Sequence, residues 1–87
     1  MNIIKTPRFS KKSSKLTKKI KRALAERIQL FIINPHDFIL NNHRLSGEFE
    51  GYRSLNITGD YRLIYEPLDE NTVRFIYIDT HHNLYGS

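Results

Sequence analysis

The sequence contains no cysteine. This excludes a disulfide framework, a thiolate metal site and a cysteine nucleophile, and it is compatible with a reducing compartment. The chain also lacks any run of about 18 apolar residues, so no segment is expected to span a membrane. The N-terminal stretch MNIIKTPRFSKK has too short an apolar part for a secretory signal. We therefore expect a cytoplasmic protein.

The length of 87 residues suits one small domain, and we expect residues 1–87 to form it without a linker or internal repeat. The chain is basic, with a formal net charge of +5 and a pI near 9.7. Seven lysines and two arginines fall between Lys5 and Arg22, whereas the acids are spread over the C-terminal half. Such a cluster attracts the phosphate backbone of nucleic acids, although a solvated helix face explains a charge run equally well.

The N-terminal half has the pattern of a short strand followed by two helices. Residues 3–4 read as the strand, residues 10–16 as a helix capped by Ser10, and residues 17–33 as a helix capped by Thr17. The second helix repeats apolar side chains at three- and four-residue spacing, which predicts a stripe that packs on a sheet. These side chains are Ile20, Leu24, Ile28 and Phe31.

The C-terminal half predicts an antiparallel meander of strands over residues 52–58, 61–66 and 73–80. The preceding connection, residues 36–50, is long for a structureless loop, so we expect it to carry function or partial structure. Helices on one face of the sheet would leave the other face open, and side-chain alternation presents Asn56 and Arg62 there.

Alternation in the last strand places Val73, Phe75 and Tyr77 on one face of the sheet. Arg74, Ile76 and Ile78 lie on the other face, so the strand is apolar on both faces and is predicted to be central. We expect the tyrosines of the strands to serve the core or the sheet rather than to stack on bases. They are Tyr52, Tyr61, Tyr65 and Tyr77.

Three segments, HRLSGEFEGYR, GDYRLIY and the ending DTHHNLYG, resemble a known family in their order and spacing. The chain resembles the RelE/ParE superfamily of type II toxin-antitoxin toxins, most closely its YafQ-like branch of ribosome-dependent mRNA endonucleases. This resemblance covers essentially the whole chain. It implies a small α+β RelE-like fold, an antiparallel sheet with an N-terminal helical hairpin packed on one face.

The resemblance also implies cleavage of mRNA in the ribosomal A site, where the 2'-hydroxyl of the substrate attacks the adjacent phosphate. This chemistry needs a base, an acid and positive charge near the phosphate. By the matching positions of the motifs, the resemblance implies that His81 is the general acid and that His43 and Asp60 are further candidates for the acid or the base. Arg62 stands where RelE-like members place a phosphate-binding arginine. The catalytic residues predicted in this way are His81, His43, Asp60 and Arg62.

Asn56 replaces a second histidine of the YafQ-like pattern. An amide forms hydrogen bonds but does not exchange a proton near neutral pH, so the division of acid and base roles does not transfer from the family. Further residues are predicted to bind the substrate or the ribosome. They are Tyr85 as a base platform, Asn56, Arg53, Lys18, Lys19 and, as an accessory, His82, which a continuing strand would turn away from His81.

Each of these residues also has an ordinary structural explanation. His81 alone could be a surface histidine, Asp60 a turn residue, and Arg62 the partner of an acid such as Glu66. Adjacent histidines without a further ligand do not form a zinc motif, so neither a metal nor another cofactor is expected.

The expected partners are a cognate antitoxin protein, the ribosome and mRNA. Two alternatives remain, a ParE-like inhibitor of DNA gyrase and a non-catalytic RNA-binding protein. The histidine-rich ending argues against the first, and the second leaves the combination of His43, Asp60 and His81 unexplained.

Overall fold

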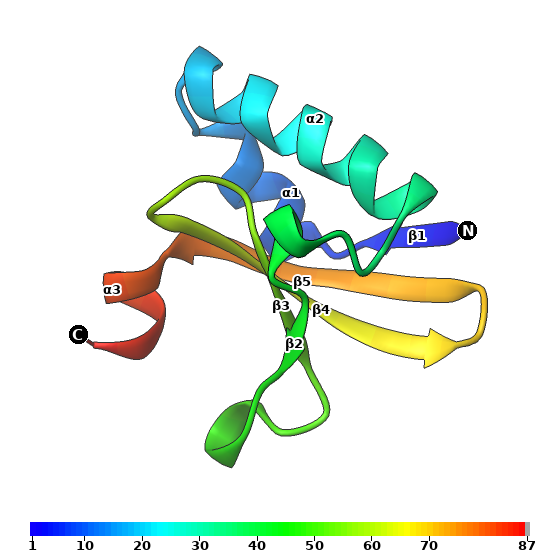
Figure 1. Ribbon diagram of the computed structural model, residues 1–87. Coiled ribbons are helices and arrows are strands. Elements are labelled where there is room, and N and C mark those ends of the chain that lie inside the picture. Colours follow the sequence, from blue (N-terminus) through cyan, green and yellow to red (C-terminus); the bar gives the residue numbers. More distant parts are fainter. Residues whose placement is uncertain (87) are drawn as a thin grey trace.

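The computed structural model describes residues 1–86, and within them the strands form one five-stranded sheet in the order β1-β5-β4-β3-β2 (Figure 1). β1 runs parallel to β5, and the other neighbours are antiparallel. This confirms the predicted α+β fold with its C-terminal meander. The strands are β1 (Asn2–Lys5), β2 (His43–Arg44), β3 (Arg53–Asn56), β4 (Tyr61–Asp69) and β5 (Thr72–Thr80).

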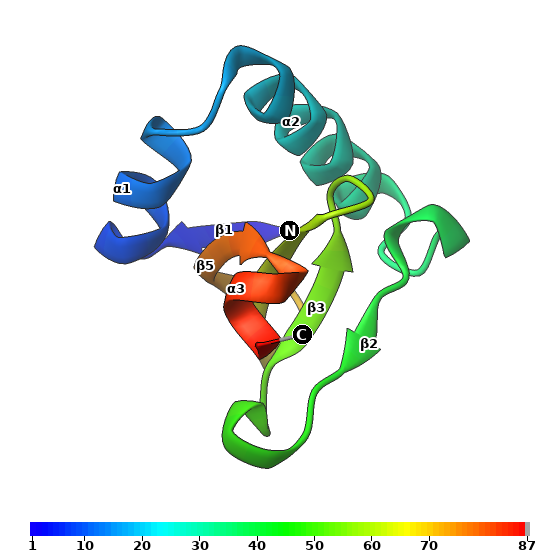
Figure 2. The same ribbon diagram turned by 90° about the vertical axis from the view of Figure 1, so that its left-hand side faces the viewer.

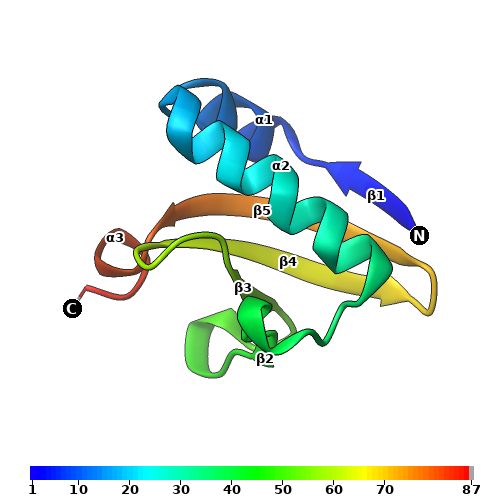
Figure 3. The ribbon, with the colours of Figure 1, turned by 45° about the horizontal axis from the view of Figure 1, so that its top comes forward.

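Helices α1 (Pro7–Ser14) and α2 (Lys18–Ile33) lie over one face of the sheet (Figures 1 and 3). The predicted cap of α2 is confirmed, because the Thr17 side chain accepts a hydrogen bond from the backbone of Ile20. The predicted start of the first helix at Ser10 is wrong. Thr6 caps α1 instead, since Pro7 at the first helical position has the φ that a helix needs.

The core lies between the two helices and the sheet. The predicted stripe of α2 is confirmed, with Leu24 and Phe31 buried and the two isoleucines packed beside them. The Phe31 ring meets the Tyr65 ring edge-on at 5.0 Å between centroids. In the described residues, no helix is long and apolar enough to cross a membrane.

A β-bulge in β5 overturns the predicted alternation of that strand. Ile64 of β4 pairs with Tyr77, but the next residue, Tyr65, pairs with Phe75, so Ile76 is an extra residue in β5. One extra residue reverses which face the following side chains occupy. Ile78 is therefore fully buried under the helices, and Tyr77 moves to the opposite face, which we call the second face.

The second face is open at its edge but not at its centre, where Ser54 and Ile64 are buried. The connection before β3 is partly structured, as expected: it contains η1 (Phe38–Leu40), β2 and η2 (Gly47–Phe49). Phe49 of η2 reaches the second face and contacts Tyr85 at 5.7 Å between ring centroids. The predicted open face presents Asn56 and Arg62, which are half-buried, but its centre is covered, because long-range contacts of this kind have no periodic signature.

The chain does not continue as a strand after Thr80 but turns into a short helix, α3 (His81–Tyr85). The Thr80 side chain caps this helix by accepting from the backbone of Asn83, and Gly86 ends it with φ 76°. The argument that alternation separates His81 from His82 is therefore wrong, because successive helical residues lie about 100° apart around the axis.

Candidate active site

The turn between β3 and β4 lies against the first residue of α3. The backbone N–H of His81 donates to the backbone oxygen of Asp60 at 2.7 Å. The first N–H groups of a helix have no partner inside it, so this bond satisfies one of them. Figure 3 shows the β3–β4 turn beside α3 at one end of the sheet. The bond holds two of the predicted catalytic residues, Asp60 and His81, next to each other there, and both are exposed.

Arg62 lies in the same region, directly across the sheet from Asn56 on one side and Asp79 on the other. Its Nη1 donates to the backbone oxygens of Thr58, Gly59 and Tyr61 at 3.0, 3.1 and 3.1 Å. These bonds fold the half-buried guanidinium onto the turn that carries Asp60. All three bonds come from Nη1, which is one of the three nitrogens that share the five N–H donors of a guanidinium.

Asp79 is the third member of this row, and no role was predicted for it. It is only 8% exposed. Its Oδ1 accepts from the Thr80 backbone at 2.8 Å and from Asn83 Nδ2 at 3.0 Å, and its Oδ2 lies 3.5 Å from Lys12 Nζ. The ionised carboxylate therefore joins the end of β5 to both α3 and α1.

The pKa of Asp79 reflects opposing effects. Burial acts to raise it, but the hydrogen bonds from Asn83 and from the Thr80 backbone, together with the charge of Lys12, outweigh burial and lower the pKa below its ordinary value. The sequence feature that could have indicated a role for Asp79 is its position two residues before the adjacent histidines.

Tyr85 packs between two rings. Its centroid lies 4.7 Å from that of His81 and 5.7 Å from that of Phe49, with edge-on geometry in both pairs. The half-buried tyrosine thus orients the His81 ring while leaving part of its own surface accessible. Its hydroxyl is buried without a hydrogen-bond partner among the described residues. Phe49 is a further contributor to the site that sequence reasoning missed.

His43 lies elsewhere on the sheet. His43 is in β2 and pairs with Ser54 of β3. β2 is the third strand from β5, a separation of about 14 Å at the usual spacing of strands. Its Nδ1 is 2.7 Å from the backbone oxygen of Asn41. A carbonyl only accepts, so Nδ1 is the donor in this bond and a neutral ring keeps Nε2 as an acceptor.

The remaining predicted residues occupy separate places. Lys18 and Lys19 are exposed in the first turn of α2, and His82 is exposed on α3. Asn56 lies beside Arg62, and its Oδ1 is buried without a hydrogen-bond partner among residues 1–86. Arg53 instead donates from Nε to Asn42 at 2.8 Å, outside the group around His81.

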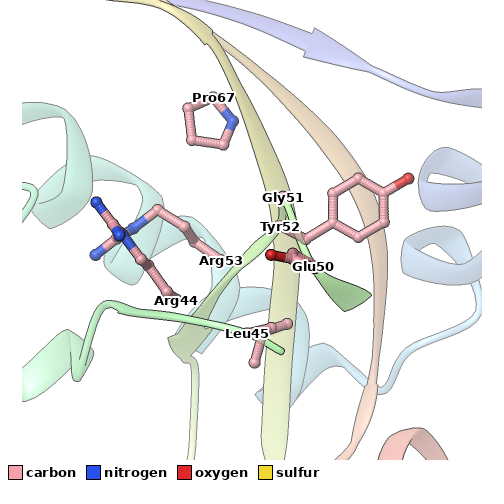
Figure 4. Close-up of a pocket in the computed structure, with 7 residues that line it drawn as sticks. All are labelled: Arg44, Leu45, Glu50, Gly51, Tyr52, Arg53 and Pro67. Atoms are coloured by element: carbon pink, nitrogen blue, oxygen red, sulfur yellow. The ribbon is translucent and has the colours of Figure 1, made fainter. Parts of the chain in front are cut away.

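Arg53 lines a cavity of about 400 Å³ at the β2–β3 hairpin (Figure 4). In this view the guanidinium groups of Arg44 and Arg53 lie on the same side of the cavity, and the Tyr52 ring points away from them. The two arginines are directly paired across the strands. None of the other predicted site residues lines this cavity, so we place the candidate active site at Asp60, Arg62, His81 and Tyr85.

Comparison with known families gives a match over nearly the whole chain. The family described as "Bacterial toxin of type II toxin-antitoxin system, YafQ" matches residues 1–86. A search of curated proteins found no significant match.

Solved structures of similar fold include toxins alone and in complexes. YafQ from E. coli is 28% identical, with a TM-score of 0.81 over 98% of each chain. A chain of the E. coli DinJ-YafQ toxin-antitoxin complex is 27% identical, with a TM-score of 0.74 over 98% of this chain and 97% of that one. A chain of the toxin-antitoxin complex RelBE2 from Mycobacterium tuberculosis is 25% identical, with a TM-score of 0.69 over 92% and 96%.

Proposed function

The chain belongs to the YafQ family of toxins from type II toxin-antitoxin systems, and on that basis we propose that it is an endoribonuclease that cleaves mRNA in the ribosomal A site. The observation that carries the proposal is the backbone hydrogen bond from His81 to Asp60, which brings these two exposed residues together beside the turn onto which the Arg62 guanidinium folds. Phosphodiester cleavage requires groups that transfer protons and a positive charge near the phosphate, and these three residue types can supply them.

In the proposed reaction the 2'-oxygen of the substrate attacks the adjacent phosphorus, and the bond from phosphorus to the 5'-oxygen breaks. His81 protonates the leaving 5'-oxygen, and the free donors of the Arg62 fork stabilise the charge on the phosphate. Tyr85, fixed between His81 and Phe49, offers a ring surface to the neighbouring base. Asn56, beside Arg62, would donate to the substrate from its Nδ2, since its Oδ1 is buried.

Two residues are candidates for the base that removes the 2'-hydroxyl proton. Asp60 is favoured by its contact with His81, and His43 by the ring nitrogen that its bond to Asn41 leaves as an acceptor. Substitution of each residue separates the two candidates. If His43 is the base, His43→Asn slows cleavage on the ribosome more than Asp60→Asn does, and if Asp60 is the base, the order is reversed.

The lysines at the start of α2 support binding to the ribosome. Positive charge in the first turn of a helix opposes the helix dipole and costs about 0.3–1 kcal/mol per residue. Lys18 and Lys19 therefore do not serve helix stability, and as exposed cations they suit the phosphates of ribosomal RNA. A ribosomal target places the protein in the cytoplasm.

A cognate antitoxin is the second proposed partner. Structures of E. coli YafQ with DinJ and of the RelBE2 pair show that relatives form such complexes. For this chain we propose an acidic antitoxin segment that covers the basic residues of α1 and α2, because opposite charge speeds the association of two proteins.

The test is induction of the protein in bacteria with mapping of cut sites on a translated message, and the same mapping in vitro with and without ribosomes. We expect cuts within translated messages and loss of toxicity in His81→Ala. His36→Ala, which removes an exposed histidine remote from α3, serves as the matched control and should remain toxic. A folded His81→Ala protein of full toxicity would contradict the role of His81, and DNA damage with intact messages would indicate gyrase inhibition instead.

A further inference from the structure

The guanidinium of Arg8 lies over the ring of Tyr77 on the second face. The Cζ atom of Arg8 lies 4.2 Å from the centre of the Tyr77 ring, and Lys12 Nζ lies 5.9 Å from it. This arrangement exists because the bulge turns Tyr77 out of the core and because α1 lies beside β5 (Figure 2). Neither Arg8 nor Tyr77 belongs to the group around His81.

Two cavities meet at this pair. One, of about 320 Å³, is basic and is lined by Arg8, Tyr77 and three lysines of α1, namely Lys11, Lys12 and Lys15. The other, of about 280 Å³, has a mixed lining in which aromatic and aliphatic side chains surround Arg8 and Asn83; they are Phe49, Tyr52, Ile64, Ile76, Tyr77 and Leu84. Because they share Arg8 and Tyr77, we treat them as one groove with a basic half and an aromatic half, the Arg8–Tyr77 groove.

We propose that the Arg8–Tyr77 groove binds one nucleotide of single-stranded RNA, with the base in the aromatic half and the flanking phosphates in the basic half. This inference rests on the proposed function, since it adds a binding subsite to an RNA-cleaving site. Proteins bind single strands in the same way, with aromatic rings for the bases and a basic track for the backbone.

The chemistry of each half fits its assigned part of the nucleotide. In the basic half Asp79 pairs with Lys12 alone among the lining lysines, and the same carboxylate also accepts hydrogen bonds from Thr80 and Asn83, so the half keeps a positive charge. In the aromatic half Asn83 donates from Nδ2 to Asp79, which leaves its Oδ1 as an acceptor for an amino group of a base.

The groove also lies where an RNA strand would pass. Asn83 and Leu84, which line it, are in α3 between His81 and Tyr85. A strand whose phosphate is held at His81 would therefore reach the groove with a neighbouring nucleotide. Tyr52 and Tyr77, which the sequence assigned to the core or sheet, acquire a binding role, whereas Tyr65 is buried as expected.

The experiment measures the affinity of a short unstructured RNA oligonucleotide by fluorescence anisotropy, with His81→Ala as the parent protein so that the RNA stays intact. We expect Tyr77→Leu and Arg8→Ala each to weaken binding about tenfold, which corresponds to the loss of one stacked base or its cation. Tyr77→Phe keeps the ring and should bind within about twofold of the parent.

Charge loss by itself is controlled by Arg44→Ala, which removes an exposed arginine from the β2–β3 cavity and should leave the affinity nearly unchanged. Lys11→Ala should reduce the slope of log affinity against log salt by about 0.7, as expected for one phosphate contact on a single strand. Unchanged affinity in folded Tyr77→Leu and Arg8→Ala proteins, or equal losses in Arg44→Ala, would overturn the proposal.

The same variants on vacant and on message-programmed ribosomes identify the source of the nucleotide. Weaker binding only to programmed ribosomes assigns the nucleotide to the message, and weaker binding to both assigns it to ribosomal RNA. No change on either, together with unchanged oligonucleotide binding, refutes the groove.

Cleavage by the His81-containing protein is a separate measurement. A groove that binds RNA in a protein that never cuts would leave this inference standing and refute the nuclease.

Discussion

Replacing Asp79 should destabilise the protein and loosen α3. Asp79→Ala removes a charged acceptor from two hydrogen bonds, at 2.8 and 3.0 Å, in a side chain that is 8% exposed. Hydrogen bonds to charged groups are worth about 1.5–3 kcal/mol, and the Lys12 pair adds little because that lysine is partly exposed. We expect a loss of about 2–3 kcal/mol in the free energy of unfolding, or about 10–20 °C in Tm.

Urea unfolding followed by circular dichroism measures this loss. Asp79→Asn keeps an acceptor oxygen and the shape of the side chain, so it should lose only about 1 kcal/mol. Asp69→Asn changes an exposed acid that caps a turn and serves as the matched control, with an effect below about 0.5 kcal/mol. If Asp79→Ala unfolds with the same free energy as the Asp69→Asn protein, the carboxylate does not fasten α3 to β5.

The lowered pKa of Asp79 also predicts how stability depends on pH. The carboxylate binds a proton less readily in the folded state than in the unfolded state, whose pKa is about 3.9. Its contribution is therefore present above about pH 5 and is lost as the pH falls through the folded-state pKa. The difference in stability between the parent and Asp79→Asn should shrink over that range, and a constant difference would contradict the assigned ionisation.

Three further substitutions test the fold and the basic helix. Phe31→Ala should cost about 3–5 kcal/mol in urea unfolding, because the ring is 1% exposed, and a cost below about 1 kcal/mol would contradict its central place in the core. Thr17→Ala should cost about 1 kcal/mol and Thr6→Ala more, because the Thr6 hydroxyl also donates to the backbone of β5 at 2.9 Å; equal costs would argue against that second bond. Lys18→Glu combined with Lys19→Glu should weaken ribosome binding in co-sedimentation assays at low salt, and unchanged binding there would count against a contact.

Local patterns in the sequence predicted the elements of the fold well. The apolar stripe of α2, its cap at Thr17 and the C-terminal meander were all predicted, because each depends on neighbours within a few residues. The order of elements also predicted helices on one face of the sheet, the resemblance to RelE-like toxins implied the same arrangement, and the family match confirms that resemblance.

The departures occur where a residue's place depends on distant parts of the chain. The bulge at Ile76 comes from the pairing of β4 with β5, and it decides that Tyr77 leaves the core. The turn of the chain into α3 depends on the Thr80 cap and on the bond from His81 to the Asp60 backbone. Neither feature changes the hydrophobic periodicity that predicts a strand.

For the candidate site too, the sequence predicted the residues but not their grouping. The motifs identified the residue types needed for RNA cleavage, namely His43, Asp60 and His81, and the roles of these residues remain predictions. Only the tertiary structure decided that Asp60 meets His81 while His43 lies three strands from β5, and that Asp79 joins α1 to α3. A sequence determines periodicity and caps through short-range interactions, whereas the grouping of side chains depends on strand register, which a single extra residue reverses.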